Sequence, residues 1–273
     1  MTGDPRWPRR LRALAVSVLF LWLVLPLVPL FIWSFARGWR FPDILPQEWS
    51  LQAWEFAFSA RSGVLESLGL TAGVAVATTV LSVLAGVPAG RALGRFRFRG
   101  KAAVELVLLA PVIVPGIAVA LGIHSVFIGL GLTNTVAGVV LVHLIPTLPY
   151  MTLLMAGTFA NFDPAFEQQA RCLGASPVQA FVHVTLPSIL PGLVVGALFA
   201  FLVSWSQYVL TLLIGGGRVI TLPLLLFTHA ASGRNDIAAA VGLIYILPGI
   251  VFLIFTSRHL TGKGVAARGP GRL

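Results

Sequence analysis

Long charge-free runs alternate with short segments that hold most of the charged residues. Residues 13–36 and 67–90 contain no charged side chain, and neither do residues 106–162. At about 1.5 Å per residue, the last run is too long for one crossing of a roughly 30 Å hydrocarbon core. Gly and Asn cluster at 129–134, so a turn is expected there. The pattern predicts six membrane-spanning helices at about 13–36, 67–90, 103–126, 135–157, 189–213 and 238–257.

Composition agrees with an integral membrane protein of the all-α class. Of the 273 residues, 57% are hydrophobic and 10% are charged, against about 25% charged in soluble domains. A net charge of +10 would suggest a nucleic-acid partner in a soluble protein. Here the basic residues stand between apolar spans, which favours anionic lipid headgroups and excludes nucleic acid. Cys172 is the single cysteine, so no intramolecular disulfide forms.

The Lys and Arg residues are distributed unevenly over alternate connections. The two termini, residues 91–101 and residues 158–188 hold 14 of the 19, which leaves five for the other side. The positive-inside rule therefore places both termini and residues 158–188 in the cytoplasm. The predicted organisation is a cytoplasmic N-terminus at 1–12, a transmembrane domain at 13–260 with a long polar connection at 158–188, and a cytoplasmic tail at 261–273.

The N-terminal apolar run has a second interpretation. A basic segment before an apolar stretch is also typical of a secretory signal peptide. The run at 13–36 is too long for that and ends near Trp33 and Arg37 instead of at a small-residue cleavage site. We interpret it as the first span.

Proline interrupts several predicted spans. In lipid the freed backbone groups need other partners, so such breaks lie against neighbouring helices or water-filled cavities, where many transporters bind substrate. The stretch 111–116, with Pro111 and Pro115, is the best candidate for a discontinuous helix in a substrate pathway, and a structural kink is the alternative. Glycines at four-residue spacing favour close helix packing, within the chain or against a partner subunit: Gly69/Gly73, Gly86/Gly90 and Gly192/Gly196.

Few ionisable groups lie in or near the spans. His124, His143 and Glu105 suggest function by their position. The alternatives are that Glu105 pairs with the basic residues at 91–101 and that each histidine makes a neutral helix contact. The spans contain no metal-ligand cluster and no catalytic constellation, and the chain has no GxxxxGK[ST] phosphate loop. We therefore expect no enzyme activity, cofactor or metal site in this chain.

The connection at 158–188 carries helix start and stop signals of its own. Asp163 followed by Pro164 is typical of an N-cap, and Gly174 fits a left-handed C-terminal position. Ser176, Pro177 and Gln179 form a capping-box pattern that starts a second helix, predicted to run to about Val184. Pro187 and Pro191 then predict a break before the fifth span.

Apolar side chains remain on these two short helices. A short helix with an apolar stripe fits into a groove of a partner, or it packs under the helix ends of its own chain. The sequence leaves both interpretations open for Phe166, Leu173, Val178, Phe181 and Val182.

The same connection resembles a known family motif. One pattern in it is similar to the EAA motif of binding-protein-dependent ABC importer permeases. The pattern runs Gln168-Gln169-Ala170, three residues, Gly174, nine residues, Val184, one residue and Leu186-Pro187. Ala170, Gly174, Leu186 and Pro187 match the motif, and Val184 conservatively replaces an Ile. Gln168 stands where the motif has Glu, and Gln169 where it has Ala. Glu167 is adjacent but points about 100° away on a helix.

The resemblance covers about residues 60–260 and implies a permease subunit in a bacterial inner membrane. It implies that the connection docks on cytoplasmic ABC ATPase subunits, that a second permease copy or paralogue completes the pore, and that an extracytoplasmic binding protein delivers solute to outer segments at 37–66 and 215–236. The implied ATPase-coupling residues are Asp163, Glu167, Gln168, Gln169, Ala170, Gly174, Ala175, Ser176, Pro177, Val184, Leu186 and Pro187.

Within the family the chain resembles permeases of the polyamine group, whose relatives import iron, thiamine and phosphonates. The segment 204–208 and the Gly-rich turn before 221–223 carry this likeness. The solute is then polyamine-like or another small solute, although residues 204–208 hold no carboxylate. Pro111, Pro115, Trp205, Gln207 and Tyr208 are candidates for the pathway, and core packing is the alternative for the last three.

Three other functions remain in view. A secondary transporter driven by an ion gradient would carry more ionisable groups at the membrane midplane than the histidines here. A membrane-embedded enzyme would need the clustered catalytic set that the spans lack. A scaffold without transport activity would bind partners and move no solute.

Overall fold

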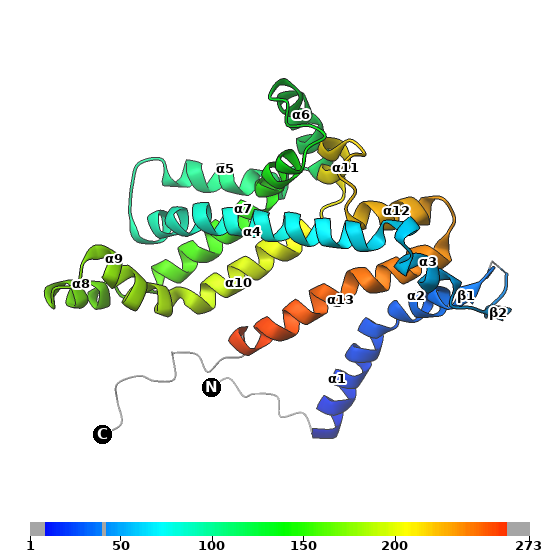
Figure 1. Cartoon of the computed structure of the whole chain (residues 1–273). Helices are drawn as coiled ribbons and strands as arrows, with labels where there is room; N and C mark the ends of the chain where they lie inside the picture. The colour runs from blue at the N-terminus through cyan, green and yellow to red at the C-terminus, as the bar shows by residue number, and fades with distance from the viewer. Residues whose placement is uncertain (1–8, 40–41, 261–273) are drawn as a thin grey trace. The chain divides into compact units, whose positions relative to one another are not determined.

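The computed structural model describes residues 9–39 and 42–260, and these residues are mainly helical (Figure 1). They form two compact units, one from the described residues up to 65 and residues 225–246, and the other from residues 66–224 and the described residues from 247 on. Residues 1–8 and 261–273, which hold most of the predicted N-terminus and tail, lie outside the described residues.

The first unit contains two helices at its start, a small sheet and a short helical segment. Its elements are α1 (Arg9–Val24), α2 (Leu27–Ser34), β1 (Ala36–Arg37), β2 (Glu48–Trp49), α3 (Gln52–Phe58) and η1 (Ala60–Ser62). The two strands pair antiparallel, with Ala36 opposite Trp49. The described residues are mainly helical, as the all-α class predicts, and this strand pair was not foreseen because two-residue strands are too short to leave an alternating pattern.

The second unit contains the longest helices. Its elements are α4 (Val64–Arg95), α5 (Lys101–Ile113), α6 (Gly116–Gly129), α7 (Val136–Ala160), α8 (Ala165–Cys172), α9 (Pro177–Ala180), the π-helical turn η2 (Phe181–Thr185), α10 (Leu186–Trp205) and α11 (Val209–Gly215). Two further helices, α12 (Leu222–Ala231) and α13 (Asn235–Leu260), have residues in both units. The helix α12 lies inside the predicted outer segment at 215–236, where the sequence analysis expected none.

Among the described residues, three helices are long and apolar enough to cross a membrane: α4, α7 and the continuous helix Pro177–Trp205. The count rises to five if each of two bent pairs is one span, α1 with α2 (44°) and α5 with α6 (107°). The segment Asn235–Val251 of α13 and the helix α12 are shorter apolar helices. A six-span arrangement stays a prediction.

The third predicted span, at 103–126, is not a straight helix. The chain turns by 107° between α5 and α6, and Val114 and Pro115 adopt extended backbone angles at the turn. A residue before proline is disfavoured in the helical region, because the proline ring clashes with its backbone. The discontinuity expected at 111–116 is therefore present, and Pro111 itself stays inside α5.

Glycines on α4 and α10 allow both helices to approach α7. A Cβ atom on Gly90 would lie 2.5 Å from Met155 Cβ and 2.9 Å from Thr152 O. A Cβ atom on Gly196 would lie 2.5 Å from Met151 Sδ. The predicted close packing at Gly86/Gly90 and Gly192/Gly196 is thus confirmed within the chain, whereas Gly69 and Gly73 have no such neighbour within 4 Å.

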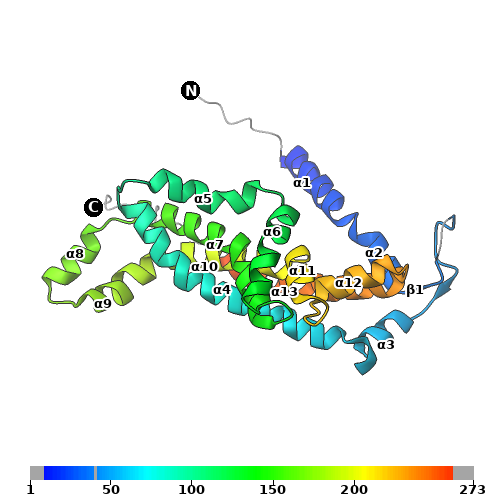
Figure 2. The same cartoon turned by 90° about the horizontal axis from the view of Figure 1, so that it is seen from above.

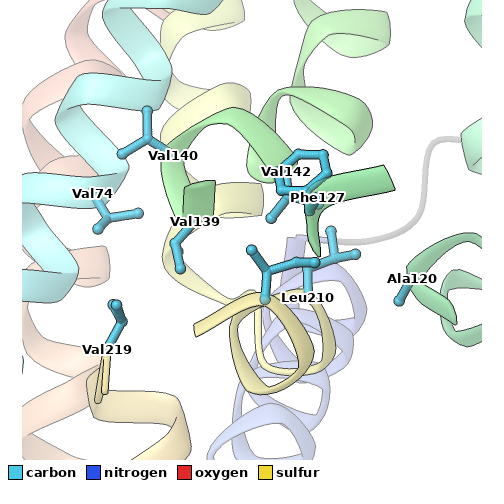
Figure 3. Close-up of a cluster of buried hydrophobic side chains, with 9 residues drawn as sticks. Val74, Ala120, Phe127, Val139, Val140, Val142, Leu210 and Val219 are labelled. Carbon is cyan, nitrogen blue, oxygen red and sulfur yellow. The ribbon is translucent and has the colours of Figure 1, made fainter. Parts of the chain in front are cut away.

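A cluster of buried apolar side chains joins four helices of this unit. Figure 3 shows side chains from α4, α6, α7 and α11 converging on this buried core. Its members are Val74, Ala120, Phe127, Val139, Val140, Val142, Leu210, Ile214 and Val219. The cluster packs α6 and α11 against α7.

We expect Gly90→Ala to destabilise the protein by about 1–3 kcal/mol, because the added methyl group meets backbone atoms of α7 that cannot move independently. Gly73→Ala on the same helix is the matched control and should change stability by at most about 1 kcal/mol. Thermal unfolding of the purified variants measures both. Equal melting temperatures for the two variants would contradict the close approach of α4 to α7.

Candidate functional site

The residues 163–187, called the corner segment below, begin with a capped helix. Asp163 Oδ1 accepts a hydrogen bond from the N–H of Ala165 at 2.9 Å, and Pro164 occupies the helical region just before α8. The capping hydrogen bond expected of Asp163 is therefore present. Figures 1 and 2 show α8 and α9 side by side at one end of the second unit.

Gly174 terminates α8 in a left-handed conformation with a φ of +91°. The N–H of Gly174 bonds to Arg171 O at 3.0 Å, and the N–H of Ala175 bonds to Ala170 O at 3.1 Å. This is the Schellman arrangement, which satisfies the last carbonyls of a helix. No neighbouring atom lies within 4 Å of a Cβ placed on Gly174, so its backbone angle, and not lack of space, is what favours glycine.

The second helix starts with the predicted capping box. Ser176 Oγ accepts from the N–H of Gln179 at 3.2 Å, and Gln179 Oε1 accepts from the N–H of Ser176 at 2.8 Å. Pro177 occupies the first turn, where its missing N–H costs nothing. Two independent local signals thus set the sharp corner between α8 and α9.

The break predicted at Pro187 and Pro191 is wrong. Residues 177–205 form one continuous helix, in which the π-helical turn η2 precedes Pro187. The N–H of Leu186 bonds to Phe181 O, five residues back. This wider turn accommodates the proline ring, which would otherwise clash with the carbonyl four residues earlier. The corner segment therefore continues directly into α10.

Glu167 connects α8 to the end of α4. Arg91 Nη2 donates to both carboxylate oxygens of Glu167, at 2.7 and 3.0 Å, and Arg95 Nη1 donates to Oε2 at 2.9 Å. The Glu167 side chain is 13% exposed. Arg91 also lies over the ring of Phe181, 5.8 Å from its centroid, so one guanidinium contacts both arms of the corner.

These contacts set the ionisation of Glu167. Desolvation of the carboxylate by itself raises its pKa, but the hydrogen bonds from Arg95 and Arg91 and their positive charges outweigh it and hold the pKa below 4.5. The sequence analysis missed the two arginines as partners. The available signal was their spacing of four residues, which puts both on one helix face once α4 continues past the predicted end at residue 90.

The corner segment presents apolar side chains to its surroundings. Phe166 is 56% exposed, Leu173 89%, Val178 71% and Val182 43%. Only Phe181 of the five candidates is half-buried, beneath Arg91. The other four side chains are exposed, so the described residues do not cover them. This disagrees with the alternative that they pack under the helix ends of their own chain.

The other motif positions lie along the same segment. Gln168 and Gln169 are exposed, and Val184, Leu186, Ala170 and Ala175 are half-buried. Glu105 meets Lys101 at 3.9 Å, as expected for pairing with the basic residues at the start of α5.

A second break separates α10 from α11 at residues 206–208. Gln207 and Tyr208 are half-buried in this break, whereas Trp205 is 4% exposed and stacks on Phe201. Core packing is therefore the better description of Trp205. The predicted span at about 189–213 is interrupted here, because the helix ends at Trp205 and restarts at Val209.

His143 of α7 bridges this break. His143 Nδ1 lies 2.9 Å from Ser204 Oγ on one side, and Nε2 lies 2.9 Å from Thr211 Oγ1 on the other. A neutral imidazole has one donor and one acceptor, which two hydroxyl groups satisfy completely. The helix-contact interpretation of His143 is thereby confirmed. Sequence reasoning missed Thr211 as a partner, because it lies 68 residues away in the chain.

Comparison with known proteins gives the family. Residues 86–261, more than half of the chain, match the family described as the inner membrane component of binding-protein-dependent transport systems. The chain belongs to this family. It is a permease subunit of an ABC importer.

Similar proteins cover nearly the whole permease. The putrescine transport system permease protein PotI of Escherichia coli (strain K12) is 27% identical over 91% of this chain and 90% of its own length. The molybdenum transport system permease protein ModB of Mycobacterium tuberculosis is 32% identical over 75% and 79%. A permease chain of a bacterial ABC transporter that imports alginate has the same fold, with a TM-score of 0.69 at 18% identity over 94% of this chain and 100% of that chain.

The family membership agrees with a transport role and not an enzymatic one. Relatives are transport permeases. Within the described residues, no group of three or more His, Cys, Asp or Glu side chains forms a metal-binding set.

Lowering the pH should remove the stabilisation that the Glu167 carboxylate contributes. A carboxyl whose folded pKa is depressed stabilises the fold above its unfolded pKa of 4.5, and this contribution is lost as the pH falls through the lower folded value. At pH 7 we expect Glu167→Gln to cost about 1–3 kcal/mol. Melting curves of both proteins should converge at acid pH, and a difference that persists there would contradict the ionic origin.

Replacing His143 by Leu should weaken the connection across the helix break. Interhelical hydrogen bonds in membranes contribute about 0.6 kcal/mol each, so we expect a loss of roughly 1 kcal/mol. A double-mutant cycle with Thr211→Val isolates the pair, and unfolding of the four proteins provides the measurement. Additive effects within about 0.3 kcal/mol would show that the two side chains do not interact.

Proposed function

We propose that this permease couples solute import to ATP hydrolysis in separate cytoplasmic subunits through the corner segment. Its two arms would dock on the ATPase, with Phe166, Leu173 and Val178 in the contact. The exposure of these side chains, 56%, 89% and 71%, supports a partner surface, because large apolar groups on a short helix are otherwise costly in water.

The observation that carries the proposal is the set of ion pairs that Glu167 forms with Arg91 and Arg95, called the clamp below. Through it, movement of α8 is transmitted to α4. Movement of α9 is transmitted to α10 without a hinge, since residues 177–205 are one helix. A partner that displaces the corner would therefore displace two long helices together, which is what opening and closing a pathway between helices requires.

The proposal includes six spans and a defined orientation. The spans would be α1 with α2, α4, α5 with α6, α7, the helix 177–205 with α11, and α13. Arg91, Arg95 and Arg171 cluster at the corner, and the excess of Lys and Arg in alternate connections supports a cytoplasmic position for this side and for both termini.

The remaining partners follow from the family. We propose a second permease subunit, identical or paralogous, and a binding protein that delivers solute on the outer side. A structure of the alginate transporter contains a periplasmic protein with its alginate pentasaccharide, and that permease chain has the fold described here, with a TM-score of 0.61.

The proposed cargo is a small solute, and a polyamine-like compound is one form of it. Relatives are named for putrescine, spermidine with putrescine, molybdenum and trehalose. Residues 204–208, at the break between α10 and α11, hold no carboxylate for a polycation. Gln207 and Tyr208 there, and Pro111 and Pro115 near the other break, are the proposed pathway residues.

An ion-driven secondary transporter was the alternative from the sequence, and the family membership disfavours it. Its coupling would need a titrating group in the pathway. His143 is 1% exposed and engaged by two hydroxyl groups, which disfavours such a role. Uptake that a protonophore abolishes while ATP is held constant would favour this alternative.

Gly174→Val tests the coupling role. A β-branched residue in a left-handed conformation costs about 1–2 kcal/mol, which should open the corner and reduce solute-stimulated ATPase activity and uptake of the reconstituted complex together. Gly174→Asn is the matched control, because asparagine tolerates this conformation and should retain most of both activities. Unchanged coupling in the valine variant would refute the role of the corner.

A further inference from the structure

A basic pocket lies between the end of α4 and α8. The cavity has a volume of about 180 Å³. It is lined by Arg91, Arg95, Phe96, Pro164, Glu167, Gln168 and Arg171.

The charges in this pocket do not balance. Glu167 is the one acidic group in the lining, and it is already engaged by Arg91 and Arg95. Arg171, one turn further along α8, is exposed and forms no ion pair with any described residue. Three guanidinium groups against one carboxylate leave an excess of two positive charges.

Gln168 preserves this excess. Its side chain lines the same pocket and is neutral, whereas a glutamate at this position would add a negative charge beside Arg171. Glu167 does not supply a free negative charge beside Arg171, because both of its carboxylate oxygens accept hydrogen bonds from α4. The pocket therefore remains a site for an anion from outside the chain.

Two kinds of surroundings at a membrane face supply negative charge, a lipid headgroup and a protein. Helices that lie on anionic membranes carry many Lys and Arg residues on their polar face. The helix α8, with the sequence AFEQQARC, has a single Arg, no Lys and one Glu. The exposed Phe166 and Leu173 on the same arm fit an apolar protein groove with a charged rim.

We propose that the basic pocket receives an acidic side chain, an aspartate or a glutamate, of the ATPase subunit. The inference rests on the proposed docking of the corner and adds the chemistry of one contact. Arg171 provides the free guanidinium, which binds a carboxylate in a bidentate manner. Arg91, whose side chain is 32% exposed against 18% for Arg95, offers its remaining edge.

This contact would connect docking to the clamp. A carboxylate that approaches Arg91 shares it with Glu167, and Arg91 also contacts Phe181. Binding of the ATPase would then act directly on the group that holds both arms of the corner to α4.

Carbodiimide cross-linking of an Arg171→Lys variant tests the contact. The reagent joins an amine to a carboxylate only when the two groups touch. The variant is co-expressed with the ATPase subunit of the same importer and reconstituted in nanodiscs, and the products are mapped by mass spectrometry. Arg99→Lys is the matched control, because Arg99 is exposed near the same end of α4 and does not line the pocket.

We expect a product between position 171 and one Asp or Glu of the ATPase, at least tenfold more abundant than any product from position 99 at that residue. Cross-links from position 171 only to Glu167, or equal yields at both positions, would overturn the proposal. Products of the native lysines occur in both variants and cancel.

The dissociation constant of the ATPase provides a second measurement. Arg171→Gln should raise it roughly fivefold to tenfold and should make it less dependent on salt. An unchanged constant, with an anionic phospholipid that the wild-type protein retains and the variant loses, would assign the pocket to lipid and overturn the proposal. If the wild-type permease bound no ATPase at all, the proposed coupling function would be refuted. Normal binding without a cross-link from position 171 to the ATPase would refute only the proposed contact in the pocket.

Discussion

Every interruption of a helix in this permease must find partners for its backbone, because the membrane offers no water to replace them. The break at 206–208 meets this constraint with side chains and local bonds. Thr211 Oγ1 donates to Gln207 O at 3.0 Å while it contacts His143, and the N–H of Gln207 bonds to Ser204 O. The backbone of this break is therefore irregular without leaving these polar groups unpaired.

The corner segment is joined to the helices behind it by contacts of a different kind. The π-helical turn keeps residues 177–205 continuous through Pro187, where an ordinary α-helix would kink. The clamp of Glu167 joins α8 to α4 across a separation of 76 residues. The small residues Gly90 and Gly196 bring α4 and α10 against α7. The corner segment is thus connected to α4 by ion pairs and to α10 by an unbroken helix.

The parts that the sequence predicted well are those that depend on neighbouring residues. Charge-free runs identified α4 and α7, and the capping box at Ser176 and the left-handed Gly174 appeared where their local patterns placed them. The failures have a different origin. A proline marks a site where a helix can break, but whether it turns by 107°, as at Pro115, or continues through a π turn, as at Pro187, depends on what packs around it. The partners of Glu167 and His143 lie more than 60 residues away, beyond any local pattern.

The family motif has a glutamate where this chain has Gln168, and the acidic side chain of this chain is the neighbouring Glu167. Glu167 and Gln168 are separated by about 100° around α8, so one side chain cannot occupy the place of the other. Glu167 turns toward α4, where two arginines consume its charge. Gln168 remains exposed beside Arg171 and contributes no charge. An acidic group at position 167 therefore holds the corner together from within and cannot also serve as an external contact. The charge that this chain presents at the pocket is therefore that of its arginines.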